Sequence, residues 1–125
     1  MIEFEHNTFF IPASLGDALD RVTILRLKIA KSKGQKQKDF LEWQLKYIVD
    51  EIMRYRDGEN FLNGPLTQEL SDINQQLWNT ENIMRKDKTI DAALQICELN
   101  GIRINIKNRI NLAFSPETTE EKVYE

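Results

Sequence analysis

The sequence predicts an all-α protein, an antiparallel bundle of four main helices at about residues 15–33, 38–56, 66–86 and 90–114. Apolar residues recur at spacings of three and four through each of these stretches, which is typical of amphipathic helices. Gly and Pro residues lie in the breaks between them. Short connections favour antiparallel neighbours, arranged either as one bundle or as two stacked hairpins. The chain has 125 residues, so we expect a single helical domain over residues 1–125.

The first predicted helix has a clear start and a clear stop. Ser14 can accept a backbone N–H from the first turn, and Asp17 favours the positive end of the helix dipole. Gly34, inside a lysine-rich connector, is the expected stop. Residues 2–11 precede this helix and are partly alternating, so they predict an extended arm or one short strand.

The second predicted helix carries an aromatic stripe beside its aliphatic one. Phe40, Trp43 and Tyr47 form this stripe at spacings of three and four. One apolar stripe is enough for a hairpin, so the second stripe needs a cover. The N-terminal arm, another helix or a second subunit could provide it, which makes these three aromatic residues a candidate interaction surface.

The last two predicted helices are separated from the rest by a loop over residues 57–65. Pro65 is well placed in a first turn, where its missing N–H costs nothing. Thr89 is the expected cap of the fourth helix, which continues to about Phe114 despite Gly101 in its interior. A short acidic tail follows. Cys97 lies among aliphatic residues, which predicts a buried, unreactive side chain.

Polar side chains form a further stripe beside the core face on three of the predicted helices. Because bundles place ligand sites on such inward-facing positions, these residues are candidate ligand-binding groups. They are Asp20, Arg21 and Lys28 on the first helix, Asn74, Trp78, Glu81 and Arg85 on the third, and Asn100, Arg103, Lys107 and Asn111 on the fourth.

The charges on these stripes favour an anionic ligand. Arg21, Lys28, Arg85, Arg103 and Lys107 stand against Asp17, Asp20 and Glu81, five bases against three acids, for a net charge of +2. Arginine can grip a carboxylate or phosphate through forked donors, and lysine acts as a point charge. The alternative is a structural network in which Asp20, Glu81, Arg85 and Arg103 neutralise each other between helices, while solvated pairs along single helices account for the other charges.

Three blocks of the sequence resemble a bacterial and viral domain-of-unknown-function family of small helical proteins. SLGDALDRVTILRLK, from Ser14, is similar to the family's S-x-G-E-x-x-D-K-x-T-I-L-E-I-K, and NQQLWNTENIMR, from Asn74, to N-x-x-L-W-x-x-E-D-x-x-R. NGIRINIKNRIN, from Asn100, is similar to N-D-x-R-x-x-x-K-x-x-I-N. Arg26, Asn82 and Gly101 stand where the family pattern has acids. The resemblance implies a site on the polar stripes and supplies no activity.

The composition argues against several kinds of function and site. Net charge is −3, from 17 basic and 20 acidic residues, whereas nucleic-acid binding normally shows as a basic excess. The only histidine is His6 and the only cysteine is Cys97, so we predict no metal site and no cofactor, and no catalytic triad can be named. The sequence has no long apolar run and no recognisable signal peptide, which predicts a cytoplasmic protein without a membrane span.

Three functions remain open from the sequence. The leading hypothesis is a non-enzymatic binding or interaction module, whose partner is another protein, a second copy of itself or a small anionic ligand. The second is a metal-free helical enzyme acting on a small anionic metabolite. The third, which the charge disfavours, is a nucleic-acid-associated accessory protein that uses the lysines of residues 31–38.

Overall fold

The computed structural model describes residues 8–115, and these residues form helices and no strand, which confirms the predicted all-α class. None of these helices is both long enough and apolar enough to cross a membrane. In chain order they are α2 (Leu15–Lys31), α3 (Gln35–Met53), α4 (Gly58–Leu62), α5 (Pro65–Asp87) and α6 (Ile90–Phe114).

The ends of the helices follow the predicted caps at three places. The Ser14 hydroxyl accepts the backbone N–H of Asp17, and the Thr89 hydroxyl accepts that of Ala92. Pro65 is the first residue of α5. These groups satisfy or remove backbone donors that a helix start leaves without intrahelical partners.

The second helix and the loop after it differ from the prediction. Helix α3 begins and ends three residues before the predicted bounds of 38 and 56, and the expected loop contains the short helix α4. A Cβ on Gly58 would lie 1.9 Å from the carbonyl oxygen of Ile52. Glycine therefore lets the chain fold back onto the end of α3, a close approach that spacing in the sequence does not reveal.

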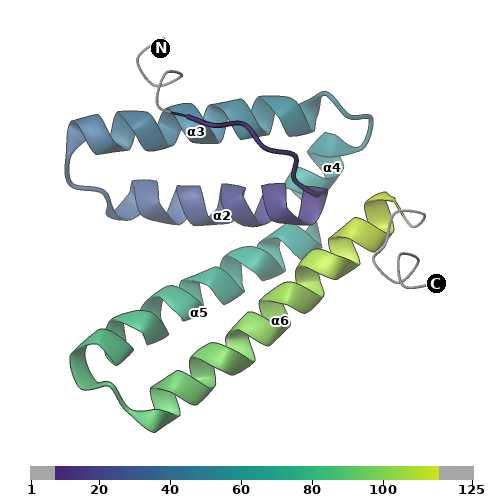
Figure 1. Ribbon diagram of the computed structural model, residues 1–125. Coiled ribbons are helices and arrows are strands. Elements are labelled where there is room, and N and C mark those ends of the chain that lie inside the picture. The colour runs from purple at the N-terminus through teal and green to yellow at the C-terminus, as the bar shows by residue number, and fades with distance from the viewer. Residues whose placement is uncertain (1–7, 116–125) are drawn as a thin grey trace.

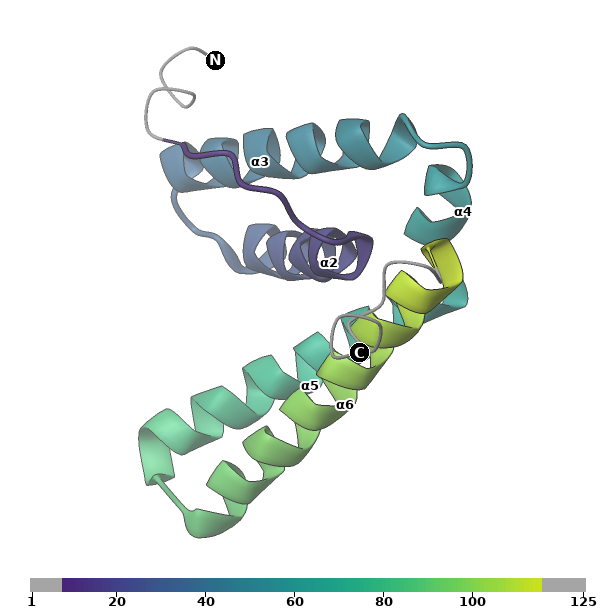
Figure 2. The same cartoon turned by 45° about the vertical axis from the view of Figure 1, so that its right-hand side comes forward.

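The four long helices pair into two antiparallel hairpins, α2 with α3 and α5 with α6 (Figure 1). Helix α2 joins them, because it packs against α3 on one side and against both α5 and α6 on the other. Figure 2 shows α3 on the outside of this stack and the far end of the α5–α6 hairpin diverging from α2. Of the two arrangements left open by the sequence, the structure has stacked hairpins.

The core lies where α2 crosses the second hairpin. Leu19, Val22, Leu70 and Ile110 are completely buried there, and Ile106 is nearly so. Each such side chain contributes roughly 1.5–3 kcal/mol when it is removed from water. This cluster fixes α6 against α2 and so sets the position of every polar side chain between them.

The aromatic stripe of α3 is partly covered from within the chain. Residues 8–14 form an arm with neither helix nor strand, and the ring of Phe10 lies 4.9 Å from the ring of Tyr47. Trp43 is only 9% exposed and stacks on Phe40. Of the three predicted interaction residues, Trp43 is therefore buried and Tyr47 is partly covered. Residues 2–7 of the predicted arm and the acidic tail lie outside the described residues.

Candidate functional site

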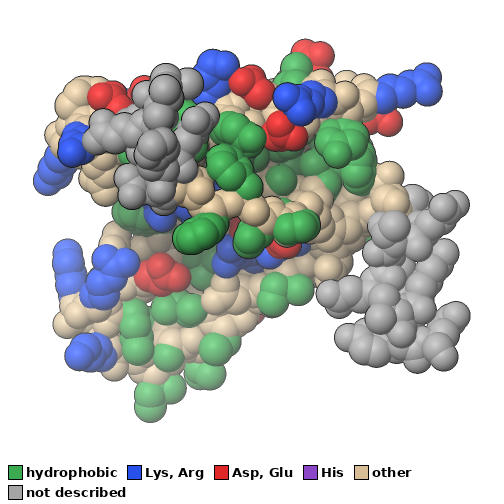
Figure 3. Space-filling model, turned by 45° about the horizontal axis from the view of Figure 1, so that its top comes forward, with side chains coloured by type: hydrophobic (Ala, Val, Ile, Leu, Met, Phe, Trp, Pro, Cys, Tyr) green, Lys and Arg blue, Asp and Glu red, His purple; other side chains and the backbone are tan. Residues whose placement is uncertain are grey.

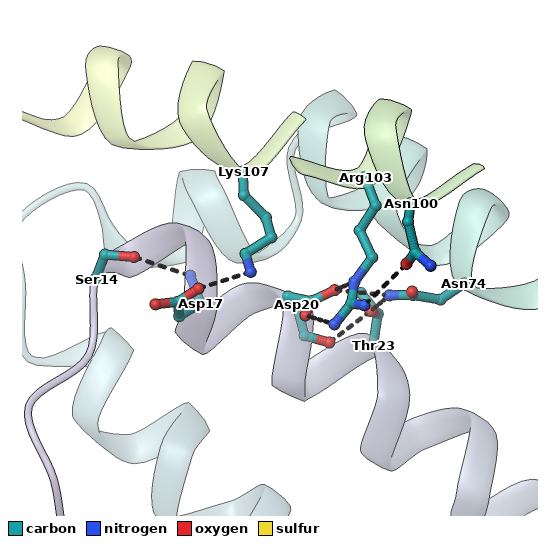
Figure 4. A network of polar contacts seen from close by, with 8 residues as sticks. All are labelled: Ser14, Asp17, Asp20, Thr23, Asn74, Asn100, Arg103 and Lys107. Carbon is teal, nitrogen blue, oxygen red and sulfur yellow. Dashed lines mark hydrogen bonds and ion pairs between the residues drawn. The ribbon is translucent and has the colours of Figure 1, made fainter. Parts of the chain in front are cut away.

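A polar cluster joins α2, α5 and α6, with the carboxylate of Asp20 at its centre (Figure 4). Arg103 donates from Nε to Asp20 Oδ1 at 2.9 Å and from Nη2 to Oδ2 at 2.5 Å. Asn74 Nδ2 donates to the same Oδ1 at 2.9 Å. A forked guanidinium and an amide thus hold both carboxylate oxygens, the geometry in which an ion pair is strongest.

Further hydrogen bonds complete the cluster. Asn74 Nδ2 also donates to the Thr23 hydroxyl at 2.8 Å, and that hydroxyl donates to the backbone carbonyl of Asp20 at 2.8 Å. Arg103 Nη1 donates to Asn100 Oδ1 at 3.4 Å. Within residues 8–115 no fully buried polar side-chain atom lacks a hydrogen-bond partner.

Burial and charge make the pair of Asp20 and Arg103 energetically important. Asp20 is only 4% exposed, so its carboxylate has exchanged water for protein donors. The hydrogen bond and charge of Asp20 raise the pKa of the Arg103 guanidinium above its ordinary value. Removing one member of such a pair leaves an uncompensated buried charge, which typically costs 3–5 kcal/mol.

A second pair ties the start of α2 to α6. Lys107 Nζ lies 2.8 Å from Asp17 Oδ1, and this hydrogen bond lowers the pKa of the Asp17 carboxyl. The backbone N–H of Gly16 donates to Asn111 Oδ1 at 2.7 Å. A Cβ on Gly16 would lie 2.5 Å from the carbonyl oxygen of Lys107, so glycine is needed for the two helices to approach.

The other predicted site residues lie away from the cluster. Arg21 points to the neighbouring helix, where its Nη2 donates to Gln44 Oε1 of α3 at 3.2 Å. Glu81 and Arg85 are exposed, although the charge of Glu81 still acts on Arg103.

Lys28 and Trp78 are half-buried, and Lys31 Nζ lies 5.6 Å from the ring centre of Trp78. The structure therefore unites Asp20, Asn74, Asn100 and Arg103, sets Lys107 and Asn111 beside them, and does not bring Arg21 into the group.

This arrangement changes the charge argument made from the sequence. Arg103 and Lys107 were two of the five cations expected to attract an anion, and each is paired with a carboxylate from α2. The alternative interpretation, a neutralised network between helices, describes Asp20 and Arg103. Its other two expected members, Glu81 and Arg85, are exposed, and the pair of Asp17 and Lys107 was not part of that expectation. Thr23 and Gly16 also belong to this contact. Neither could be predicted from the sequence, because a hydroxyl on a helix and a glycine near its start have many ordinary roles.

The opposite side of α6 carries a second set of residues that we call the outer seam. Four of them lie two positions before the four buried residues of α6, Ala92, Leu99, Ile106 and Ile110. Two positions on a helix are about 200°, so the two stripes face opposite ways. The outer seam consists of Ile90, Leu94, Cys97, Gly101, Ile104 and Asn108.

The outer seam is exposed along its whole length. Ile90 is 78%, Leu94 63% and Ile104 56% exposed, and Figure 3 shows hydrophobic side chains on the surface of the α5–α6 hairpin. Cys97 is also exposed, so the prediction of a buried thiol is wrong. The aliphatic residues near it in the sequence do not share one side of the helix, because Leu94 is exposed whereas Leu99 is buried. The alternating spacing was present in the sequence, but two apolar stripes on one helix do not reveal which is buried.

Known proteins offer no direct guide to these two features. Comparisons with models of protein families, with curated proteins and with solved structures found no match. Within residues 8–115 no group of three or more His, Cys, Asp or Glu residues is arranged to hold a metal ion. The polar cluster and the outer seam are therefore the two features of the structure that bear on function.

Proposed function

We propose that this protein is a non-catalytic interaction module that binds another helix along the outer seam of α6. The observation that carries the proposal is the line of large aliphatic side chains, Ile90, Leu94 and Ile104, each more than half exposed. Exposed apolar area costs roughly 25 cal/mol per Å², a cost that a bound partner would remove. Large apolar side chains exposed along one side of a helix favour a protein-binding site.

The polar cluster supports the same proposal by what its groups already do. Asp20 is buried and both of its oxygens accept hydrogen bonds from within the chain. Arg103, the residue best suited to grip an anionic substrate, is the donor of two of them. We infer that the polar cluster around Asp20 has a structural role, and we call it the structural joint. It holds the inner side of α6 against α2 and leaves the outer seam free to bind.

The family resemblance is compatible with this role and remains a proposal. The positions shared with the family's three blocks include Asp20, Asn74, Asn100, Arg103 and Lys107, and these are members of the joint or lie beside it. We infer that the blocks encode the contact between the hairpins. A protein related through them would keep the same joint whatever its outer surface binds.

Cys97 provides a test because it is a natural reporter in the middle of the outer seam. Its rate of alkylation by a maleimide is measured in cells that naturally make the protein and in dilute purified protein. Rates are normalised to a reporter cysteine placed at the exposed position Gln75 of α5, by Gln75→Cys in a Cys97→Ser background. A partner on the seam should make Cys97 react several-fold more slowly in cells.

Two substitutions assign this protection to the seam. Leu94→Glu places a charge in the apolar line and should restore fast alkylation. Gln95→Glu introduces the same carboxylate at the next, also exposed position, off the seam, and should preserve protection. Equal normalised rates for the unmodified protein in cells and in dilute solution would contradict the proposed function.

A further inference from the structure

We infer that the helix bound by the outer seam is α6 of a second copy of this chain, lying parallel and in register. This inference rests on the proposed function and names the partner that the seam fits best. Three observations support it: the order of residues along the seam, the position of Glu98 beside it, and a glycine, Gly101, that no contact within one chain explains.

The outer seam has the spacing of a coiled-coil interface. Its six residues alternate steps of four and three from Ile90 to Asn108, which is the a and d pattern of a heptad repeat. They extend over five turns of helix, about 27 Å at 1.5 Å per residue. Ile90, Cys97 and Ile104 occupy d positions, and Leu94, Gly101 and Asn108 occupy a positions.

A parallel, in-register pair matches each seam residue with its own kind. Aliphatic residues then meet aliphatic residues, and the two Asn108 amides can hydrogen-bond to each other. One asparagine at an a position is a known device for fixing register and oligomeric state. Asn108 thus favours pairing with an identical helix over pairing with an unrelated apolar helix.

Gly101 has no explanation inside one chain. Its φ is not positive, and a Cβ added to it would meet nothing within 4 Å. Glycine in a helix interior nevertheless costs roughly 1 kcal/mol relative to alanine. At the middle of a paired seam, two glycines would let the helix backbones approach closely, which gives the residue a purpose.

The antiparallel arrangement is less favourable on two counts. In an antiparallel pair the a positions of one helix face the d positions of the other, so the Asn108 amide faces Ile90 of the other copy. The amide is then buried without a matching donor or acceptor. It also brings the two Glu98 side chains together beside the seam. In the parallel pair, Glu98 lies beside Ala93 of the other copy, so this charge meets no like charge.

The first measurement is the mass of the purified full chain by sedimentation velocity over a range of concentrations. The inference predicts a reversible monomer–dimer equilibrium. Leu94→Glu would bury two carboxylates in the dimer and should weaken dimerisation by about 100-fold or more, whereas Gln95→Glu should change it less than about tenfold.

The second measurement tests the direction of pairing. Ile90→Cys in a Cys97→Ser background places one cysteine at the end of the seam. In a parallel dimer the two thiols are adjacent, and a short bis-maleimide should link them. In the antiparallel alternative they are separated by the full length of the seam, about 27 Å, which is beyond the reach of a short linker. Leu94→Glu added to this variant should abolish linking.

The outcomes separate this inference from the proposed function. A dimer that is sensitive to Leu94→Glu and links through position 90 supports the inference, while a dimer that does not link there overturns the parallel register. A strict monomer whose Cys97 is protected in cells overturns the second-copy inference and leaves the proposed function with a different helix as partner. A strict monomer with unprotected Cys97 overturns both.

Discussion

Asp20 shows how the same residue can suggest a ligand site in a sequence and a structural role in a fold. In the sequence it is one acid in a ladder of polar side chains with a net charge of +2. In the structure it is 4% exposed and accepts three hydrogen bonds through its carboxylate. Spacing placed Asp20, Asn74 and Arg103 on inward faces correctly. Spacing cannot distinguish side chains that pair with each other from side chains that are available to bind a ligand.

We expect Arg103→Ala to lower the free energy of unfolding by about 3 kcal/mol, because it leaves the Asp20 carboxylate buried without its cation. Equilibrium unfolding in urea measures this loss. Arg109→Ala is the matched control on the same helix, since Arg109 pairs with Glu69 at 3.4 Å on the surface and should cost less than about 1 kcal/mol.

A companion variant keeps this prediction decisive if Arg103→Ala fails to fold. Asp20→Asn combined with Arg103→Met removes both charges and should recover part of the lost stability. An Arg103→Ala variant as stable as Arg109→Ala would contradict the assignment of Arg103 to a structural joint.

At the scale of the helices, the sequence predicted the periodic parts and missed the close contacts. The core positions of α2 were foreseeable from spacing, and Leu19, Val22 and Leu25 are all fully buried. The crossing of α2 and α6 was not, because it depends on the missing side chain of Gly16. A glycine at a helix start has several ordinary uses, and only its neighbour across the interface shows which one applies.

Two glycine substitutions should therefore act in opposite directions. Gly16→Ala sets a Cβ 2.5 Å from the Lys107 carbonyl oxygen and should destabilise the fold by about 1–3 kcal/mol, as over-packed contacts do. Gly101→Ala meets no atom within 4 Å and should stabilise an isolated chain by up to about 1 kcal/mol through helix propensity. Thermal or urea unfolding at low protein concentration measures both, and destabilisation by Gly101→Ala would contradict this account of α6.

At the scale of the whole molecule, helix α6 separates two roles between its two sides. Its inner side packs on α2 and α5 and carries the joint, while its outer side exposes the seam. The sequence predicted the all-α class and the four main helices. It could not predict which apolar stripe of α6 is buried, because that depends on how the two hairpins stack.

The most direct measurement of this division is the unfolding free energy, in dilute solution, of the same substitution on the two sides of α6. Leu99→Ala removes a side chain that is 6% exposed and should cost about 2–5 kcal/mol. Leu94→Ala removes one that is 63% exposed and should change stability by less than about 0.5 kcal/mol. Equal losses at the two positions would show that the outer seam serves the folding of the single chain, and would contradict its assignment as a docking surface.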